Sequence, residues 1–165
     1  MERFDPEMFR EVARKKQQLD KAQCVELLKT EMRGVLSLIG DGGYPYGLPI
    51  DHWYHEEDGC LYFHSGPVGH KVDAIRNCDK ASFCVYDQGF RKDGDWALNI
   101  KSVIVFGRIE IVEDHEKAIE LTRALSFKYT SDAAYIQEEI DKYGHEVLVF
   151  KLVPEHMTGK ITKES

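Results

Sequence analysis

The stretch that decides the fold is CLYFHSGPVGHKVDAIRN, residues 60–77. Its first part is an apolar run that ends at His64, which is typical of a buried β-strand. A loop with two glycines and a proline follows, and apolar residues at helical spacing begin directly after His70 and Lys71. The sequence therefore predicts a strand that ends near His64, then a loop, and then a short helix over about residues 67–77.

The junction between this strand and this helix has the features of an anion site. Gly66 and Gly69 would let backbone N–H groups approach a ligand, Lys71 adds a positive charge, and His70 can donate a hydrogen bond. The predicted helix turns the positive end of its dipole to the same place. A phosphate is the anion that fits best. The alternative is an ordinary turn whose lysine is solvated.

The segments before the junction predict an antiparallel meander. Strand-like runs separated by short turns cover residues 34–40, 44–56 and 60–64. Pro45 and Pro49 favour an edge strand or a bulge. A helix is expected over about 21–32, opened by a capping box of Asp20 and Gln23 and stopped by Gly34.

The segments after the junction add strands and two helices. Strands are expected at 80–87, 102–114 and from about 146 onward, helices at 115–129 and 131–143 with Gly144 as C-cap, and a long irregular loop at 88–101. Six or seven strands with connections too short for parallel crossovers predict an α+β, mainly β fold. We expect a small antiparallel barrel with flanking helices.

Composition narrows the class of protein. The chain has 165 residues and a formal net charge of −7, which fits one domain over 1–165 with a polar N-terminal arm over 1–19. The acidic balance argues against nucleic acid as a partner, since only Arg14–Lys16 form a basic cluster. No signal-peptide pattern, membrane-length apolar run or CxxC pair is present. We therefore expect a cytoplasmic protein with reduced thiols and no membrane role.

Other chemical motifs are weak. His52 and His55 form H-x-x-H, but residues three apart on a strand face opposite sides, so no metal site is expected. The P-loop, G-x-G-x-x-G and G-x-S-x-G patterns are absent. Trp96 lies in the irregular loop and is the better candidate for a lid, whereas Trp53 is expected in packing.

The run from Tyr44 to Asp87, YPYGLPIDHWYHEEDGCLYFHSGPVGHKVDAIRNCDKASFCVYD, resembles the flavin-binding split barrels related to pyridoxamine 5′-phosphate oxidase. The likeness extends over about 20–162 and is greatest to the branch of nitroimidazole-resistance (Nim) proteins. It implies a six-stranded antiparallel split β-barrel that forms a homodimer, with FMN in a cleft at the subunit interface.

The resemblance also implies roles for individual residues. By position, His70 and Lys71 match the basic pair that holds the FMN phosphate, and Ser102 stands where the oxidases carry a glutamine that contacts ring or phosphate. The strand end beside the phosphate corresponds to Phe63, His64 and Ser65. The strand along the isoalloxazine ring corresponds to Leu48, Pro49, Ile50 and Asp51.

Departures from the family shape the functional prediction. Tyr46 and Asp51 stand near an Arg and a Lys of the oxidases, and the C-terminal substrate-binding arginines have no counterpart. These differences argue against pyridoxamine phosphate oxidation. The resemblance to the Nim branch then implies an FMN-dependent oxidoreductase that reduces small nitroaromatic or related electrophiles with electrons from a reduced nicotinamide. His64 is the best candidate to contact the small-molecule substrate or the flavin phosphate; a structural histidine at a strand end is the alternative.

Two further functions stay open. One is a non-catalytic flavin- or haem-binding protein, for which His64, His145 and His156 are the available axial ligands. The other keeps the barrel and replaces FMN by a deazaflavin in a reductase.

Overall fold

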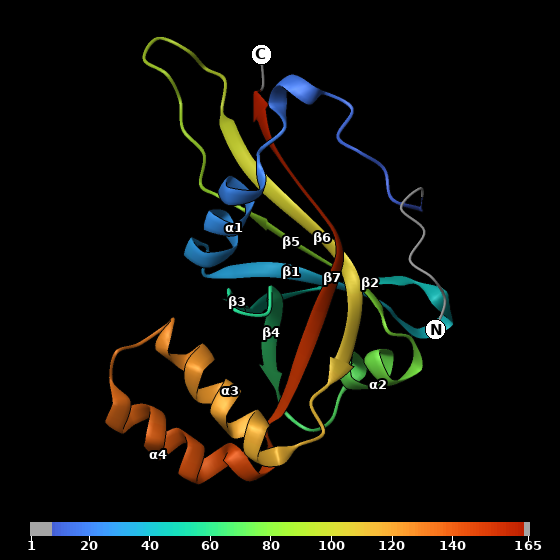
Figure 1. Cartoon of the computed structure of the whole chain (residues 1–165), viewed down its shortest axis with the longest axis vertical. Coiled ribbons are helices and arrows are strands. Elements are labelled where there is room, and N and C mark those ends of the chain that lie inside the picture. The colour runs from blue at the N-terminus through green and yellow to red at the C-terminus, as the bar shows by residue number, and fades with distance from the viewer. Residues whose placement is uncertain (1–7, 164–165) are drawn as a thin grey trace.

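The computed structural model describes residues 8–163 and forms a curled antiparallel sheet with helices around it (Figure 1). The helices are α1 (Lys21–Thr30), α2 (His70–Asn77), α3 (His115–Phe127) and α4 (Ala133–Tyr143), with 3₁₀ turns η2 (Lys15–Gln17), η3 (Asp41–Gly43) and η4 (Gly144–Glu146). The strands are β1 (Arg33–Ile39), β2 (Pro45–Asp51), β3 (Trp53–His55), β4 (Cys60–Ser65), β5 (Lys80–Tyr86), β6 (Asn99–Ile111) and β7 (Leu148–Lys163). Of the predicted arm, residues 1–7 lie outside the described part.

The sheet closes on itself through one corner. Its strand order is β2-β1-β5-β6-β7-β4-β3, so β2 and β3 occupy opposite edges although only His52 separates them in the chain. A chain that passes in one residue from one edge to the other requires a strongly curled sheet. This confirms the predicted α+β split barrel, with seven strands among the described residues where six were expected.

The core fills the inside of the curl. Alternate side chains of each strand point inward, and Phe63, Phe83 and Phe150 are fully buried there together with Leu28 from α1. The rings of Phe63 and Phe83 meet edge to face with centroids 5.1 Å apart. Burial of these aromatic rings together with the surrounding Leu, Val and Ile side chains stabilises the domain.

The capping box of α1 is confirmed, and the predicted helix stop is corrected. Asp20 accepts a hydrogen bond from the Gln23 N–H at 2.8 Å, and the Gln23 side chain accepts from the Asp20 N–H at 3.0 Å. The helix ends at Thr30, before Gly34, which lies inside β1. Gly34 is needed for packing, because a Cβ there would collide with the ring of Phe83.

The largest boundary errors are in the last two strands. β6 begins at Asn99, three residues earlier than predicted, because Asn99 to Lys101 pair with the end of β7. The irregular loop is therefore shorter, covering 87–98. The C-terminal segment is one strand of 16 residues, and it bends at a bulge near Gly107, where β6 and β7 shift register. Gly144 does cap α4, but in the right-handed conformation.

The outer face of the barrel divides into a half covered by helices and a half that no α-helix covers. The N-terminal arm lies over part of the second half, where the Phe9 ring stacks on Phe106 and Ile104 lines a cavity beneath the arm. Helix α3 packs over β4 and β7, where Cys60 and Tyr62 meet Ala118 and Leu121, and α4 packs against α3. The face formed by β1, β5 and β6 carries large apolar side chains that stay exposed: Val35, Ile39, Tyr86, Ile104 and Phe106. We call this set the open sheet face. Cross-strand pairing places Val35, Cys84 and Ile104 in one row across it.

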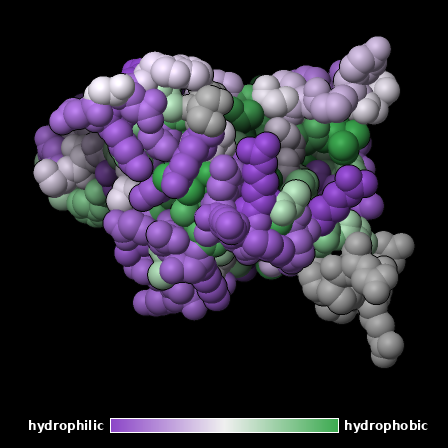
Figure 2. All heavy atoms as spheres, turned by 90° about the horizontal axis from the view of Figure 1, so that it is seen from above, coloured by the Kyte–Doolittle hydropathy of each residue, from purple (hydrophilic) through white to green (hydrophobic). Residues whose placement is uncertain are grey.

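The end of the molecule that bears the 87–98 loop is predominantly hydrophilic, with hydrophobic residues visible between hydrophilic ones (Figure 2). Among the described residues, no helix has the length and apolar character required to cross a lipid bilayer.

Candidate functional site

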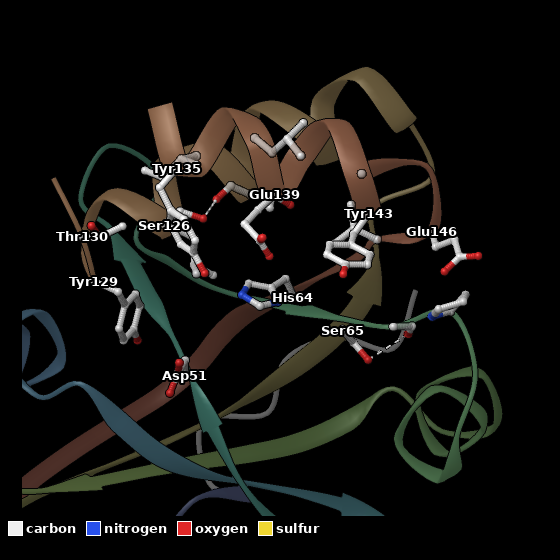
Figure 3. Close-up of a pocket in the computed structure, with 18 residues that line it drawn as sticks. Asp51, His64, Ser65, Ser126, Tyr129, Thr130, Tyr135, Glu139, Tyr143 and Glu146 are labelled. Atoms are coloured by element: carbon white, nitrogen blue, oxygen red, sulfur yellow. Dashed lines mark hydrogen bonds between the residues drawn. The ribbon is translucent and has the colours of Figure 1, made fainter. Parts of the chain in front are cut away.

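A pocket of about 470 Å³ lies between the end of β4 and the hairpin of α3 and α4 (Figure 3). We call it the α4 pocket. Its floor comes from the end of β2 and from β4, and its roof comes from the two helices. It is lined by Asp51, His64, Ser65, Gly66, Pro67, Thr122, Leu125, Ser126, Tyr129, Thr130, Tyr135, Ile136, Glu139, Ile140, Tyr143, Gly144, Glu146 and Val147.

His64 stands at the centre of the pocket floor. It lies in β4 between buried Phe63 and Ser65 and pairs with Val149 of β7, while its own ring is open to the pocket. Burial of the imidazole lowers its pKa, nearby Lys71 lowers it further, and Asp51 opposes both effects. The ring is therefore neutral at pH 7, so one nitrogen can donate a hydrogen bond and the other can accept one.

The loop after His64 leaves the start of α2 open to a ligand. Gly69 is the N-cap at φ 134°, a backbone conformation that favours glycine, and no side chain caps the helix. Within the described residues, the N–H groups of His70 and Lys71 have no acceptor. A Cβ added at Gly66 or Gly69 would meet no atom within 4 Å. Backbone donors at a helix N-terminus in open space fit an anion.

Lys71 and His70 differ in their availability. Lys71 forms no ion pair or hydrogen bond with the described residues, although it is close enough to His64 to influence its pKa. The ring of His70 instead stacks on Tyr46, with centroids 4.1 Å apart, and its Nε2 accepts a 3.3 Å hydrogen bond from the Asp41 N–H. The structure thus brings Lys71 and the His70 backbone to the junction, while the His70 ring packs against η3.

Strand β2, which the resemblance places along the isoalloxazine ring, presents alternate residues to opposite sides of the sheet. Ile50 is buried in the core and Leu48 packs against it, whereas Pro49 is exposed on the outer side. Asp51 lines the α4 pocket and pairs with Arg33, with 2.8 Å between Oδ1 and Nε. Because β2 is an edge strand, one side of its backbone has free hydrogen-bonding groups. Any contact through Leu48 or Ile50 would therefore use the backbone.

Phe63 and Ser65 differ in whether their side chains reach the pocket. The Phe63 ring lies in the core, away from the pocket. Ser65 lines the pocket, and its hydroxyl donates to the Gly66 carbonyl at 2.9 Å, which helps to fix the first residue of the loop. Of the three residues predicted at this strand end, His64 and Ser65 present side chains to the site.

Ser102 does not meet the other predicted residues within one chain. It lies on β6, three strands from β2, and lines a separate cavity of about 330 Å³ beneath the N-terminal arm, beside Arg10 and Lys160. Trp96 lies in the 87–98 loop, at the opposite end of the molecule from α3 and α4 (Figure 1). Trp53 packs against the cluster beneath α3, as expected.

His52, His145 and His156 do not line the α4 pocket, although His145 stands between two residues that do, Gly144 and Glu146. His145 is exposed beside Glu146, and the ring of His156 stacks on Phe9 with centroids 5.2 Å apart. His52 is fully buried at the corner between β2 and β3. Among the described residues, no group of three or more His, Cys, Asp or Glu side chains could hold a metal ion.

The corner at His52 is held by the end of α3. The Tyr129 hydroxyl accepts from the His52 N–H at 2.8 Å and lies 2.6 Å from the Met32 carbonyl, and Lys128 Nζ donates to the His52 carbonyl at 2.9 Å. Burial raises the pKa of Tyr129 to about 12 and lowers that of Lys128 to about 8. Because Tyr129 also lines the α4 pocket, this network fixes part of the pocket wall relative to Asp51.

Sequence reasoning missed the roof of the pocket. Tyr129, Tyr135, Glu139 and Tyr143 all line it from the helical hairpin (Figure 3). One signal was available: Glu139 falls on the same helical face as Ile136 and Tyr143, where an amphipathic helix normally carries an apolar residue.

Comparison with known proteins gives a consistent family. The sequence model described as pyridoxamine 5′-phosphate oxidase matches residues 20–161. The search of curated proteins finds no match.

Several solved structures share the fold. A candidate 5-nitroimidazole antibiotic resistance protein from Bacteroides thetaiotaomicron is 21% identical, with TM-score 0.73 over 88% of this chain and 87% of that chain. The flavocytochrome Anf3 from Azotobacter vinelandii is 18% identical, with TM-score 0.74 over 94% and 75%. An FAD-binding protein from Mycobacterium smegmatis is 18% identical, with TM-score 0.59 over 90% and 99%.

Proposed function

Because the chain belongs to the pyridoxamine 5′-phosphate oxidase family, we propose that it is a cytoplasmic, homodimeric flavoprotein that binds FMN and reduces small nitroaromatic or related electrophiles. The single observation that carries this proposal is the open start of α2 beside Lys71, which has no partner among the described residues, adjoining the pocket around His64.

The residues at this junction fit a flavin phosphate. The free N–H groups of His70 and Lys71 would bind phosphate oxygens, and Lys71 Nζ would add a charge-assisted hydrogen bond. Gly66 and Gly69 leave room for the phosphate to approach the backbone. Asp73 in the first turn of α2 is the opposing negative charge, so Lys71 is required to offset it.

Bound FMN would supply hydride transfer, and the protein would bind and orient the reactants. His64, neutral at pH 7, can donate a hydrogen bond to a polar group in the pocket or accept one from it. Leu125, Ile136 and Ile140 give the roof an apolar surface. Asp51, whose charge is partly offset by Arg33, would not stabilise negative charge on a reduced flavin ring as a lysine there would.

A second copy of the chain is the partner that we propose for the open sheet face. Val35 and Ile104 are exposed in one row across β1, β5 and β6, with Cys84 between them, and no α-helix among the described residues covers this row. Monomeric proteins rarely leave such surfaces in water. In a homodimer, Ser102 at the border of this face could reach the flavin of the partner, which would explain its distance from His64 within one chain.

The substrate and cofactor choices draw on the relatives. The names of the relatives include nitroimidazole resistance and FAD binding, and one relative is a flavocytochrome. We favour flavin over haem because no Lys or Arg side chain lines the α4 pocket to pair with haem propionates, although His64 lines the pocket and is available as a ligand. A deazaflavin would use the same phosphate site as FMN, so binding at this site does not distinguish the two. The visible spectrum of the purified protein separates FMN, haem and a deazaflavin.

The cofactor assignment is tested with Lys71→Ala. Loss of a charge-assisted hydrogen bond, about 1.5–3 kcal/mol, predicts that FMN binds roughly ten- to a hundredfold more weakly by fluorescence titration. Lys80→Ala is the matched control, since Lys80 is an exposed lysine just beyond the other end of α2. Equal FMN affinity in the two variants would refute the phosphate site.

The activity is tested separately on FMN-loaded protein. We expect NADH or NADPH oxidation that depends on an added nitroaromatic compound under anaerobic conditions. Flavin binding without such oxidation would identify a carrier or sensor in place of an enzyme.

A further inference from the structure

The roof of the α4 pocket carries a carboxylate in an unusual position. Ile136, Glu139, Ile140 and Tyr143 follow the spacing of one helical face, and all four line the pocket. Ile136 is buried and Glu139 is half-buried. An apolar residue at position 139 would complete the buried face of α4 at lower cost, because a carboxylate loses hydration there. The glutamate therefore needs an explanation other than packing.

Glu139 has no partner among the described residues, unlike its acidic neighbours. Glu138 pairs with Lys142, with 2.6 Å between Oε1 and Nζ, and Glu146 lies 3.6 Å from His145 Nε2. Figure 3 shows the Glu139 carboxylate directed down from α4 toward His64, across the open space of the pocket. A ligand in that space would lie between the carboxylate and the imidazole.

The walls around this space are negative and aromatic. The charged lining groups are Asp51, Glu139 and Glu146. Asp51 pairs with Arg33 and Glu146 lies 3.6 Å from His145 Nε2, whereas Glu139 has no partner among the described residues. Tyr129 and Tyr143 contribute aromatic surface, and the hydroxyl of Tyr129 is held at the Met32 carbonyl. Such walls attract a flat cation or a flat N–H donor and repel a flat anion.

We propose that the α4 pocket selects flat aromatic ligands that carry a cationic or N–H-donating group, with Glu139 as the acceptor, and rejects anionic aromatics of the same shape. This inference rests on the proposed function, because it makes the pocket the substrate side of the flavin site. The two ends of the site then have opposite preferences: the flavin phosphate binds beside Lys71, and the electropositive part of the substrate binds beneath α4.

Three probes of nearly equal shape test the selection: benzamidinium, benzamide and benzoate. Dissociation constants are measured by NMR titration on the full chain, with and without FMN. We expect benzamidinium to bind most tightly and benzoate most weakly. Glu139→Gln should weaken benzamidinium binding about tenfold, as for the loss of a charge-assisted hydrogen bond, and should narrow the gap to benzoate. The matched control is Glu138→Gln, one residue away and already paired with Lys142.

The outcomes separate this inference from the proposed function. Equal effects of Glu139→Gln and Glu138→Gln, or benzoate binding as tightly as benzamidinium, would overturn the selection while leaving the FMN result intact. Normal charge selection in a protein that does not bind FMN would support the pocket and reject the flavoprotein assignment.

Discussion

The corner residue His52 makes the stability of the protein depend on pH in a predictable window. Its ring is fully buried, its Nε2 lies 2.7 Å from the Leu28 carbonyl, and its Nδ1 is buried without a partner. Burial lowers the pKa of this imidazole from 6.5 to about 4, and the charge of Lys128, whose Nζ is 3.3 Å from Nε2, adds to the effect. His52 is therefore neutral in the folded protein at pH 6.

The sign and size of the effect follow from linkage. Between pH 6.5 and about 4 the unfolded chain binds a proton at His52 that the folded chain does not bind, so stability falls as pH decreases through this window. At about 1.36 kcal/mol per pKa unit, the full shift corresponds to roughly 3 kcal/mol, a large part of the stability of a small domain.

His52→Gln is the perturbation that isolates this contribution. A glutamine amide can replace the Nε2–H donor to the Leu28 carbonyl, and it does not titrate. We measure the free energy of unfolding by urea denaturation at about pH 7 and at about pH 4. The decrease between these two pH values should be about 3 kcal/mol smaller in the variant than in the wild type. His145→Gln, at an exposed position, should retain the wild-type slope. The same pH dependence in wild type and His52→Gln would refute the assignment.

Two further predictions concern the barrel and its open face. Gly107→Ala should lower the free energy of unfolding in urea denaturation by more than about 2 kcal/mol, because the added Cβ would collide with the Val153 carbonyl at the bulge. Gly47→Ala is the control and should be tolerated, because its Cβ would make only ordinary van der Waals contacts. Equal stabilities of the two variants would contradict this explanation. Ile104→Glu should convert the dimer to a monomer in sedimentation experiments. Phe127→Glu, at an exposed apolar position on α3, is the control and should leave the dimer intact. A monomeric wild-type protein, or an Ile104→Glu variant that is still a dimer, would rule out the open sheet face as the interface.

The local features of the fold could be predicted from sequence because they depend on neighbours in the chain. The strand before the glycine loop, the loop, the helix after it and the capping box of Asp20 are all local patterns, and the structure has each of them. The boundaries differ slightly, since β4 ends at Ser65 and α2 begins at His70, three residues later than predicted. The start of β6 was missed because the polar run from Asn99 to Lys101 resembles a loop. It is a strand only because β7 pairs with it.

The candidate site was predictable only in part, for the same reason. Lys71, His64 and the glycines lie in one short segment, so their grouping is visible in the sequence. The roof comes from α4, more than 60 residues later in the chain, and only the tertiary packing of the hairpin brings Glu139 over His64. The His70 ring was assigned to the anion site because periodicity does not reveal that it stacks on Tyr46.

The most direct measurement is a crystal structure of the protein with FMN. The account predicts that the terminal phosphate lies against the N–H groups of residues 70 and 71 within hydrogen-bond distance of Lys71 Nζ, and that the ring runs along the backbone of β2. Flavin bound elsewhere on the chain, or a crystal grown in excess FMN whose α2 terminus holds no phosphate, would contradict it.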